Sequence, residues 1–350
     1  MAVLSDAQRE AGWTIAKLGD IAPLTYGKSL VASKRIPGDV PVYSSAGLID
    51  SHNESIIDGQ NIIIGRKGTI GSITWSEGPA YPIDTTFYTA GTEKVNIKYL
   101  YYLLKTYKFS EMNTDSAVPG LNRVTFESQE AVLPPLEEQG RIAGILGSLD
   151  DKIEANTRLI QTVKDYMAAL YKAEAKNGKV LELTDIADFV NGRAFTKDAT
   201  GTGRVVIRIA ELNNGLGGST VYNDIEAKEE NTAYPGDILM SWSGSLDTYV
   251  WHLPEAIINQ HIFKVIPKGN YPKWLVYHAC KSVIEDFQAI AVDKATTMGH
   301  IRRGDLKRDI TIPAREMPQM ENLWSLWMNL EQENLQLAET RDALIKRLIG

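Results

Sequence analysis

The stretch Leu133-Pro134-Pro135-Leu136-Glu137-Glu138-Gln139-Gly140-Arg141-Ile142 marks the start of a long predicted helix. Apolar residues follow it at steps of three and four, the spacing of a helix that lays a narrow stripe on another helix. They are Ile142, Ile145, Leu149, Ile153, Ile160, Val163, Met167 and Leu170. Neither a helix-breaking proline nor a tight-turn dipeptide interrupts the chain from Leu136 to Lys176. Roughly forty residues rising about 1.5 Å each form a rod on the order of 60 Å long, so we predict a mid-chain spacer helix.

Composition limits the class of protein. A chain of 350 residues is long enough for two domains with real cores, and one cysteine, Cys280, excludes a disulfide framework. The first dozen residues lack the apolar run of a signal peptide, and no run is long enough to span a membrane, so we expect a cytoplasmic protein without membrane partners. The net charge of −7 argues mildly against a free-standing nucleic-acid binder. Basic residues nevertheless cluster locally, at Arg66-Lys67 and Arg302-Arg303.

Self-comparison reveals an internal repeat. Lys17-Leu18-Gly19-Asp20-Ile21-Ala22 aligns with Glu182-Leu183-Thr184-Asp185-Ile186-Ala187. A second block keeps an offset of 176 positions (238 − 62), and it pairs Ile62 with Ile238, Gly68 with Gly244, Thr69 with Ser245 and Trp75 with Trp251. Towards the end of each copy Gly120 pairs with Gly299, Arg123 with Arg302, and Pro134 with Pro313. The shared order over so many segments indicates a duplication.

Each copy therefore consists of a globular segment followed by a long helix. We predict a first globular domain at 1–133, a spacer helix at 134–178, a second globular domain at 179–313 and a second helix at 314–350. Within the globular segments, β-rich runs bounded by turn residues predict strands at 40–43, 61–64, 87–89, 205–209, 237–240 and 262–266. Short helices are predicted at 98–107 and 272–286. The fold class is α+β.

The two long helices need a partner for their apolar stripes, and the economical arrangement packs them antiparallel about a pseudo-two-fold axis. Asn156 interrupts the first stripe and Asn334 the second, each near the centre of its helix. A buried asparagine in such a seam typically fixes register at some cost in stability. Alternatively, both asparagines lie at the wet edge of the stripe. The predicted seam comprises Ile153, Asn156, Ile160, Val163, Leu330, Asn334 and Leu337.

These residues match a known family. Pro134-Pro135-Leu136-Glu137-Glu138-Gln139, followed by Ile142, Leu146, Leu149-Asp150 and Ile153, resembles the spacer helix of type I restriction–modification specificity (S) subunits. Residues 13–21 and 120–134 look like the opening and closing segments of that family's target recognition domains. The tandem plan resembles the family over almost the whole chain. The main departure is Met317-Pro318-Gln319 where the first copy has Glu138-Gln139-Gly140, so the second half is less clearly a docking surface.

The resemblance implies a function. In that family two target recognition domains each read half of a split site on double-stranded DNA, and two antiparallel, coiled-coil-like helices hold them apart. Methylation (M) subunits, here expected as two copies, dock on the S subunit, and restriction (R) subunits join through them. S-adenosylmethionine, ATP and Mg²⁺ then belong to the partners, and this chain itself carries no cofactor and is not an enzyme. A two-fold reader spans half-sites about one DNA turn, roughly 34 Å, or a multiple of it apart.

The residues expected to contact DNA lie in polar loops after equivalent strands and in glycine turns. Arginine and lysine can bond guanine edges, whereas serine and threonine are less selective. Gly27-Lys28 and Gly192-Arg193 are turns that can present a cation to phosphate. The candidates are Lys28, Arg66, Lys67, Thr69, Asn122, Arg123, Arg193, Trp242, Ser243, Ser245, His300, Arg302 and Arg303. Ordinary exposed surface remains an alternative for each of them.

Two other classes of function stay open. An enzyme could use Glu226 in a metal-dependent nuclease site, or Lys28 in the loose phosphate-loop match Ala22-Pro23-Leu24-Thr25-Tyr26-Gly27-Lys28-Ser29. The five histidines show no paired ligand spacing, so no metal site is predicted. An interaction scaffold without DNA is the other alternative. Finally, Trp324 and Trp327 on the second helix suggest an exposed patch for a partner, while Trp13, Trp75, Trp251 and Trp274 are expected in cores.

Overall fold

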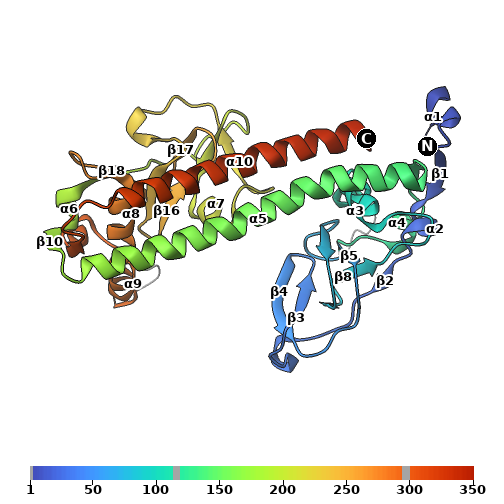
Figure 1. The fold of residues 1–350 in the computed structure, drawn as a ribbon, viewed down its shortest axis with the longest axis horizontal. Coiled ribbons are helices and arrows are strands. Elements are labelled where there is room, and N and C mark those ends of the chain that lie inside the picture. Colours follow the sequence, from blue (N-terminus) through green and yellow to red (C-terminus); the bar gives the residue numbers. More distant parts are fainter. Residues whose placement is uncertain (1–2, 113–118, 294–299) are drawn as a thin grey trace. The chain divides into compact units, whose positions relative to one another are not determined.

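The computed structural model, drawn in Figure 1, describes residues 3–112, 119–293 and 300–350. The chain divides into two compact units. Unit 1 comprises Met1–Lys152 and Leu337–Gly350, and unit 2 comprises Ile153–Gln336. The two long helices, α5 (Leu136–Ala175) and α10 (Pro318–Leu348), each contribute to both units. Mixed sheets and helices in both units confirm the α+β class.

Unit 1 contains two small sheets and a closing ribbon. One sheet has the order β2-β8-β5-β6, the other the order β4-β3-β7, and β1 pairs with β9. The strands are β1 (Thr14–Lys17), β2 (Thr25–Tyr26), β3 (Val40–Ser44), β4 (Gly47–His52), β5 (Asn61–Gly65), β6 (Ile73–Ser76), β7 (Tyr81–Pro82), β8 (Thr86–Thr89) and β9 (Glu130–Leu133). The α-helices are α1 (Asp6–Glu10), α2 (Leu18–Ile21), α3 (Ile97–Lys105) and α4 (Arg123–Glu127), and the ribbon β1-β9 brings the start of the globular segment back to its end.

The core of unit 1 joins its sheet to both long helices. Ile62 and Phe87 pack in one cluster with Leu146 of α5 and Ile345 of α10. Beside this cluster, the carboxylate of Asp150 on α5 accepts hydrogen bonds from Tyr102 Oη of α3 at 2.6 Å and from Arg341 Nη1 of α10 at 2.7 Å. Burial, and then the bond to Asp150, raises the pKa of Tyr102, so the phenol stays a proton donor.

Unit 2 repeats the plan with more strands. Its sheets have the orders β11-β18-β15-β16 and β13-β12-β17-β14, and the ribbon β10-β19 closes the segment. The strands are β10 (Lys179–Glu182), β11 (Ala187–Asn191), β12 (Arg204–Ile207), β13 (Val221–Asn223), β14 (Thr232–Ala233), β15 (Asp237–Ser241), β16 (Thr248–Trp251), β17 (Ala256–Ile258), β18 (Ile262–Pro267) and β19 (Asp309–Ile312). The helices are α6 (Leu183–Ile186), α7 (Ile209–Asn214), α8 (Lys273–Ser282) and α9 (Ile284–Asp293).

Strand register shows where the repeat holds and where it slips. Ile62 faces Thr89 in unit 1 and Ile238 faces Val265 in unit 2, so both pairs keep the offset of 176. Across the next ladder, Ile62 faces Trp75 but Ile238 faces Val250. The predicted pairing of Trp75 with Trp251 is therefore wrong by one residue. Because one step along a strand reverses the face, Trp251 is buried in unit 2, whereas Trp75 stays partly exposed and donates its Nε1–H to Glu77.

Two predicted segments end differently. The strand predicted at 205–209 stops at Ile207, because Arg208 adopts the N-cap position of α7 and its backbone N–H bonds to the Glu211 carboxylate. The helix predicted at 272–286 breaks at Val283 into α8 and α9.

The predicted partner patch at Trp324 and Trp327 is also wrong. Both indoles are buried in the core of unit 2, where their rings pack on each other and on Tyr277. Among the described helices, none is long and apolar enough to cross a lipid bilayer.

In unit 2 the long helices run antiparallel and side by side (Figure 1). Asn156 faces Asn334 and Lys164 lies over Trp327, so residue numbers rise along α5 as they fall along α10. In the same order, Glu174 pairs with Arg315, which lies just before α10. Asn156 is 2% exposed, and its Nδ2 donates to Asn334 Oδ1 at 3.0 Å and to Glu333 Oε2 at 2.8 Å. Of the predicted seam, Ile160, Val163 and Leu330 are buried, while Ile153, Asn334 and Leu337 are partly exposed.

We expect the substitution Asn156→Ala to destabilise unit 2 by about 1–2 kcal/mol, because it leaves acceptors in the seam without their donor. Replacing Asn156 and Asn334 together by Leu should cost less than this single change, because the Asn334 acceptor is removed along with its donor and the partly exposed Glu333 can turn to water. Urea unfolding followed by tryptophan fluorescence measures the effect, because five of the seven tryptophans lie in unit 2. The exposed Asn322→Ala on α10 is the control, and an equal loss there would contradict the assignment.

Candidate nucleic-acid interface

In each unit, equivalent backbone hydrogen bonds join two loops, and we call this contact the loop A–loop B joint. We call residues 66–69 and 242–245, which follow β5 and β15, loop A, and residues 120–122 and 300–302 loop B. In unit 1 the Leu121 N–H donates to the Arg66 carbonyl at 2.9 Å; in unit 2 the Ile301 N–H donates to the Trp242 carbonyl at 3.1 Å. The N–H groups of Arg66 and Trp242 donate in turn to the carbonyls of Thr85 and His261. The backbone of loop A is thus held on both sides, while its side chains are free to differ.

This joint corrects the sequence alignment of loop B. Leu121 and Ile301 occupy the same place but are 180 positions apart (301 − 121), one more than predicted. Asn122 is the N-cap of α4, and Arg302 is the N-cap of the 3-10 turn Arg303–Leu306. Arg302 therefore corresponds to Asn122, and the predicted pairing with Arg123 is wrong by one residue. Gly299, which was expected to pair with Gly120, lies outside the described residues.

Glycine turns lie beside loop A in both units. The N–H of Gly27 donates to Thr86 and that of Gly192 to Ile262, at 3.1 and 2.9 Å. A Cβ on either glycine would lie 2.1 Å from a backbone carbonyl oxygen, of Ile83 or Asn259. Any residue other than glycine would therefore clash with the backbone at these two positions. The following cations, Lys28 and Arg193, are held through their backbone N–H groups, and both residues are exposed.

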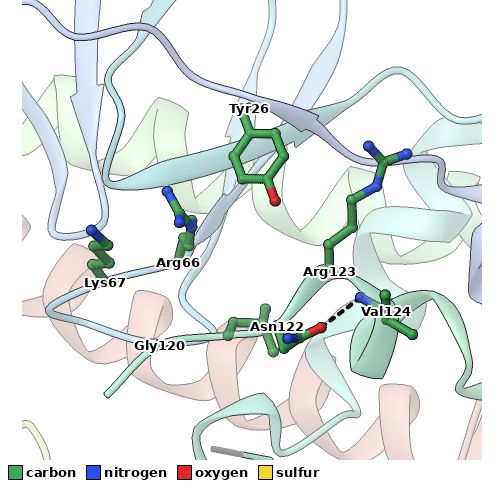
Figure 2. A pocket seen from close by; sticks show the side chains of 8 residues that line it. Tyr26, Arg66, Lys67, Gly120, Asn122, Arg123 and Val124 are labelled. Carbon is green, nitrogen blue, oxygen red and sulfur yellow. Dashed lines mark hydrogen bonds between the residues drawn. The ribbon is translucent and has the colours of Figure 1, made fainter. Parts of the chain in front are cut away.

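In unit 1 the two loops line an open depression of about 440 Å³ together with Tyr26 (Figure 2). Its lining residues are Tyr26, Arg66, Lys67, Gly120, Leu121, Asn122, Arg123 and Val124. The described lining residues include three cations and no carboxylate, so this part of the depression suits an anionic or electron-rich ligand. Figure 2 shows Arg66 and Lys67 on one side of Tyr26 and Arg123 on the other.

The predicted residues of unit 1 are engaged to different degrees. The Oδ1 of Asn122 caps α4 by accepting from the Val124 N–H at 2.8 Å, and Arg123 Nε pairs with Glu127 Oε1 at 2.7 Å. Both side chains thus stabilise local structure as well as lining the depression. Lys67 and Thr69 are exposed. The Arg66 guanidinium lies over an aromatic ring, with its Cζ 4.9 Å from the centroid of Tyr26.

Unit 2 fills the equivalent place with an indole. Trp242 Nε1 donates to Asn191 Oδ1 at 2.7 Å, and the ring packs on His261 with centroids 4.9 Å apart. Ser243 is buried and forms an isolated β-bridge with His300. The exposed predicted residues here are Arg193, Ser245, His300, Arg302 and Arg303.

Sequence reasoning missed the residues on which the loop A side chains lie. In unit 1 this residue is Tyr26, and in unit 2 the matching residue is Asn191, each directly before the turn glycine. The sequence did contain a signal for these residues, because aligning Gly27 with Gly192 also aligns Tyr26 with Asn191. It could not be read as a contact without knowing that β2 and β11 end beside loop A. His261, with φ of +78°, and Val124 were also missed.

Metal-binding geometry is not found in the described part of the chain, where no group of three or more His, Cys, Asp or Glu side chains could hold an ion. Glu226 is exposed. The absence of a metal or cofactor from this chain stays a prediction.

The chain belongs to the family of the type I restriction modification DNA specificity domain, whose model matches it twice, at residues 10–165 and 176–322. The double match confirms the predicted duplication and the resemblance to S subunits.

Two known proteins illustrate the relationship. A Haemophilus influenzae protein described as a type I restriction enzyme specificity subunit is 23% identical over 240 residues, which span 63% of this chain and 62% of that protein. The crystal structure of the type I restriction-modification system S subunit from M. genitalium is 15% identical, with a TM-score of 0.57 over 100% of this chain and 98% of that one. At this identity the second likeness bears on the fold alone.

We expect Gly27→Ala and Gly192→Ala each to destabilise their own unit by about 1–3 kcal/mol or more, because the added methyl group must displace a backbone carbonyl. Gly218→Ala is the matched control, since a Cβ there meets nothing within 4 Å. Thermal unfolding of the three variants measures the difference. Equal melting temperatures for Gly27→Ala and Gly218→Ala would show that the turn is not constrained as described.

Proposed function

We propose that this chain is the subunit that reads a bipartite site on double-stranded DNA, with the loop A–loop B joint of each unit reading one half. The observation that carries the proposal is that both units hold the two loops with equivalent hydrogen bonds yet present different side chains. Reading two unlike half-sites needs this combination of a fixed frame and variable edges, because base identity is read by side chains placed in a groove.

The charges of the loops suit this role. Lys67 is exposed beside Arg66 in unit 1, and Arg302 and Arg303 are exposed in unit 2, where cations can contact phosphates or guanine edges. The chain as a whole is acidic, at −7, so its own phosphate contacts are few. We therefore expect tight binding only in a complex whose other subunits add cations.

We further propose that methylation subunits dock on α5 and that restriction subunits join through them. Support comes from a second, exposed stripe on this helix in unit 2, separate from the buried seam. It repeats at steps of four and three and comprises Ala155, Leu159, Thr162, Tyr166, Ala169 and Ala173, with Leu159 43% and Tyr166 55% exposed. Such spacing matches the apolar face of a second amphipathic helix. S-adenosylmethionine, ATP and Mg²⁺ would then be bound by the partners.

Methylation mapping tests the DNA-reading role. In cells that hold the methylation subunit, we expect a split methylated motif that disappears when this chain is deleted. Arg66→Ala should relax one half of the motif and Arg302→Ala the other, because each residue lies in a different unit. A motif that survives the deletion would overturn the proposal and favour a scaffold without DNA contacts. Loss of both halves in either variant would mean that the residue supports the fold or holds phosphate.

Binding measurements test the docking surface. We expect Leu159→Ala combined with Tyr166→Ala to weaken binding of the methylation subunit by roughly 30- to 900-fold, about 2–4 kcal/mol, because two large exposed anchors are lost. Gln161→Ala combined with Lys172→Ala, on the polar face of the same helix, should change it little. Helix content by circular dichroism confirms that α5 persists. Equal affinities for the two double variants would place the partner elsewhere.

A further inference from the structure

We propose that Arg66 reads a guanine in the half-site of unit 1 and that Tyr26 is the positioning residue that orients its guanidinium for that contact. The inference rests on the proposed function and adds to it the base that is read, the atoms that read it and the residue that sets their geometry.

The backbone of Arg66 is fixed before any ligand arrives. Its N–H donates to the Thr85 carbonyl at 2.9 Å, and its carbonyl accepts from the Leu121 N–H at 2.9 Å. The residue directly follows β5, whose five residues are all buried. The Cα of Arg66 therefore holds a constant position at the rim of the depression, and only the side-chain torsions remain to be set.

Aromatic rings set those torsions. The Cζ of Arg66 lies 4.9 Å from the ring centroid of Tyr26 and 5.7 Å from that of Phe87. Tyr26 in turn packs on Phe87 with centroids 4.8 Å apart, and Phe87 is fully buried. A guanidinium that rests its face on a ring keeps its in-plane N–H donors available, and holding it there reduces the entropy lost on binding.

Arg66 also differs in its partners from two other arginines of unit 1. Arg123 pairs with Glu127 and Arg35 with Asp50, both within 3.0 Å. For Arg66, the described residues offer no carboxylate within ion-pair distance, and its one polar side-chain contact is the Asp84 carbonyl, 3.5 Å from Nη1. Among the residues that the structure describes, most of its donors thus remain unused, and those lining the depression include no acidic side chain.

Guanine is the base that completes this arrangement. Arginine donates two parallel hydrogen bonds to guanine O6 and N7, which are both acceptors on the major-groove edge. Adenine presents an N6 amino donor in place of O6, so one arginine donor would face another donor. Lys67, next in sequence, is a flexible point charge without the planar fork that matches both acceptors of guanine, so we assign it to phosphate.

Comparison of the two units indicates which half of the DNA site would contain the guanine contact. In unit 2 both members of the pair are replaced, Tyr26 by Asn191 and Arg66 by Trp242, and these two side chains hydrogen-bond to each other. In each unit, the residue at the end of a strand therefore contacts the first residue of loop A. The guanine contact should accordingly exist in one half of the recognised site only.

The test is methylation in cells by the complete complex, read as base frequencies at every position of the mapped motif. We expect the wild-type chain to require guanine at one position of one half. Arg66→Ala and Arg66→Lys should reduce the preference for guanine there by about 5- to 150-fold. Tyr26→Leu should reduce it by about 2- to 30-fold, whereas Tyr26→Phe, which keeps the ring, should retain it. The matched control Lys67→Ala should weaken methylation of all sites alike, without a change in base preference.

The outcomes separate the two proposals. A split motif that depends on this chain, but whose guanine positions are all unchanged in Arg66→Ala, would overturn the guanine contact and leave the DNA-reading role intact. Loss of preference in Tyr26→Phe as severe as in Tyr26→Leu would assign the effect to the hydroxyl and overturn positioning by the ring. Absence of any motif that depends on this chain would overturn the proposed function itself. Thermal unfolding of Tyr26→Leu, compared with wild type, separates lost positioning from lost folding.

Discussion

The backbone hydrogen bond between loop A and loop B is the constraint on which the candidate interface depends. It joins residues far apart in sequence, Leu121 to Arg66 and Ile301 to Trp242, at almost equal lengths. Because both partners are main-chain groups, the bond is indifferent to the side chains of either loop. A duplicated domain can therefore change the chemistry of its rim without changing the frame that positions it. The same reasoning explains why the charge, size and exposure of the loop residues differ so strongly between the units.

Much of the fold follows from periodicity and duplication. The spacing of Ile160, Val163 and Met167 predicts a helix with one buried stripe, and these three side chains are buried in α5. The strands that contain Ile62 and Ile238 are easily predicted from sequence. Every residue of β5 and nearly every residue of β15 is buried, so both segments are almost continuously apolar. Such signals are local and repeat in the chain, so sequence alone reveals them.

The errors arise where a single residue is inserted or where exposure depends on tertiary packing. Trp75 and Trp251 look equivalent in the sequence, but β16 is offset by one step relative to β6, which reverses the face of the strand. Trp324 and Trp327 follow an indistinct apolar pattern, and only the position of Tyr277 on α8 shows that they are covered. For the candidate interface, sequence proposed loop A and the cations as candidates, but it did not predict that Tyr26 would lie beneath Arg66. That contact depends on β2 pairing with β8, a long-range contact that no local pattern encodes.

The division of the chain also bears on the order in which the molecule can be assembled. Unit 2 is one continuous stretch, Ile153–Gln336, whereas unit 1 combines Met1–Lys152 with Leu337–Gly350. Ile345, from the later segment, is buried among side chains of the earlier one. During synthesis on the ribosome, the first globular segment must therefore wait until all of unit 2 has been translated before its core can close. In the interval Leu146 and its neighbours on α5 lack one of their covering helices, so the earliest part of the protein to emerge is the last to be completed.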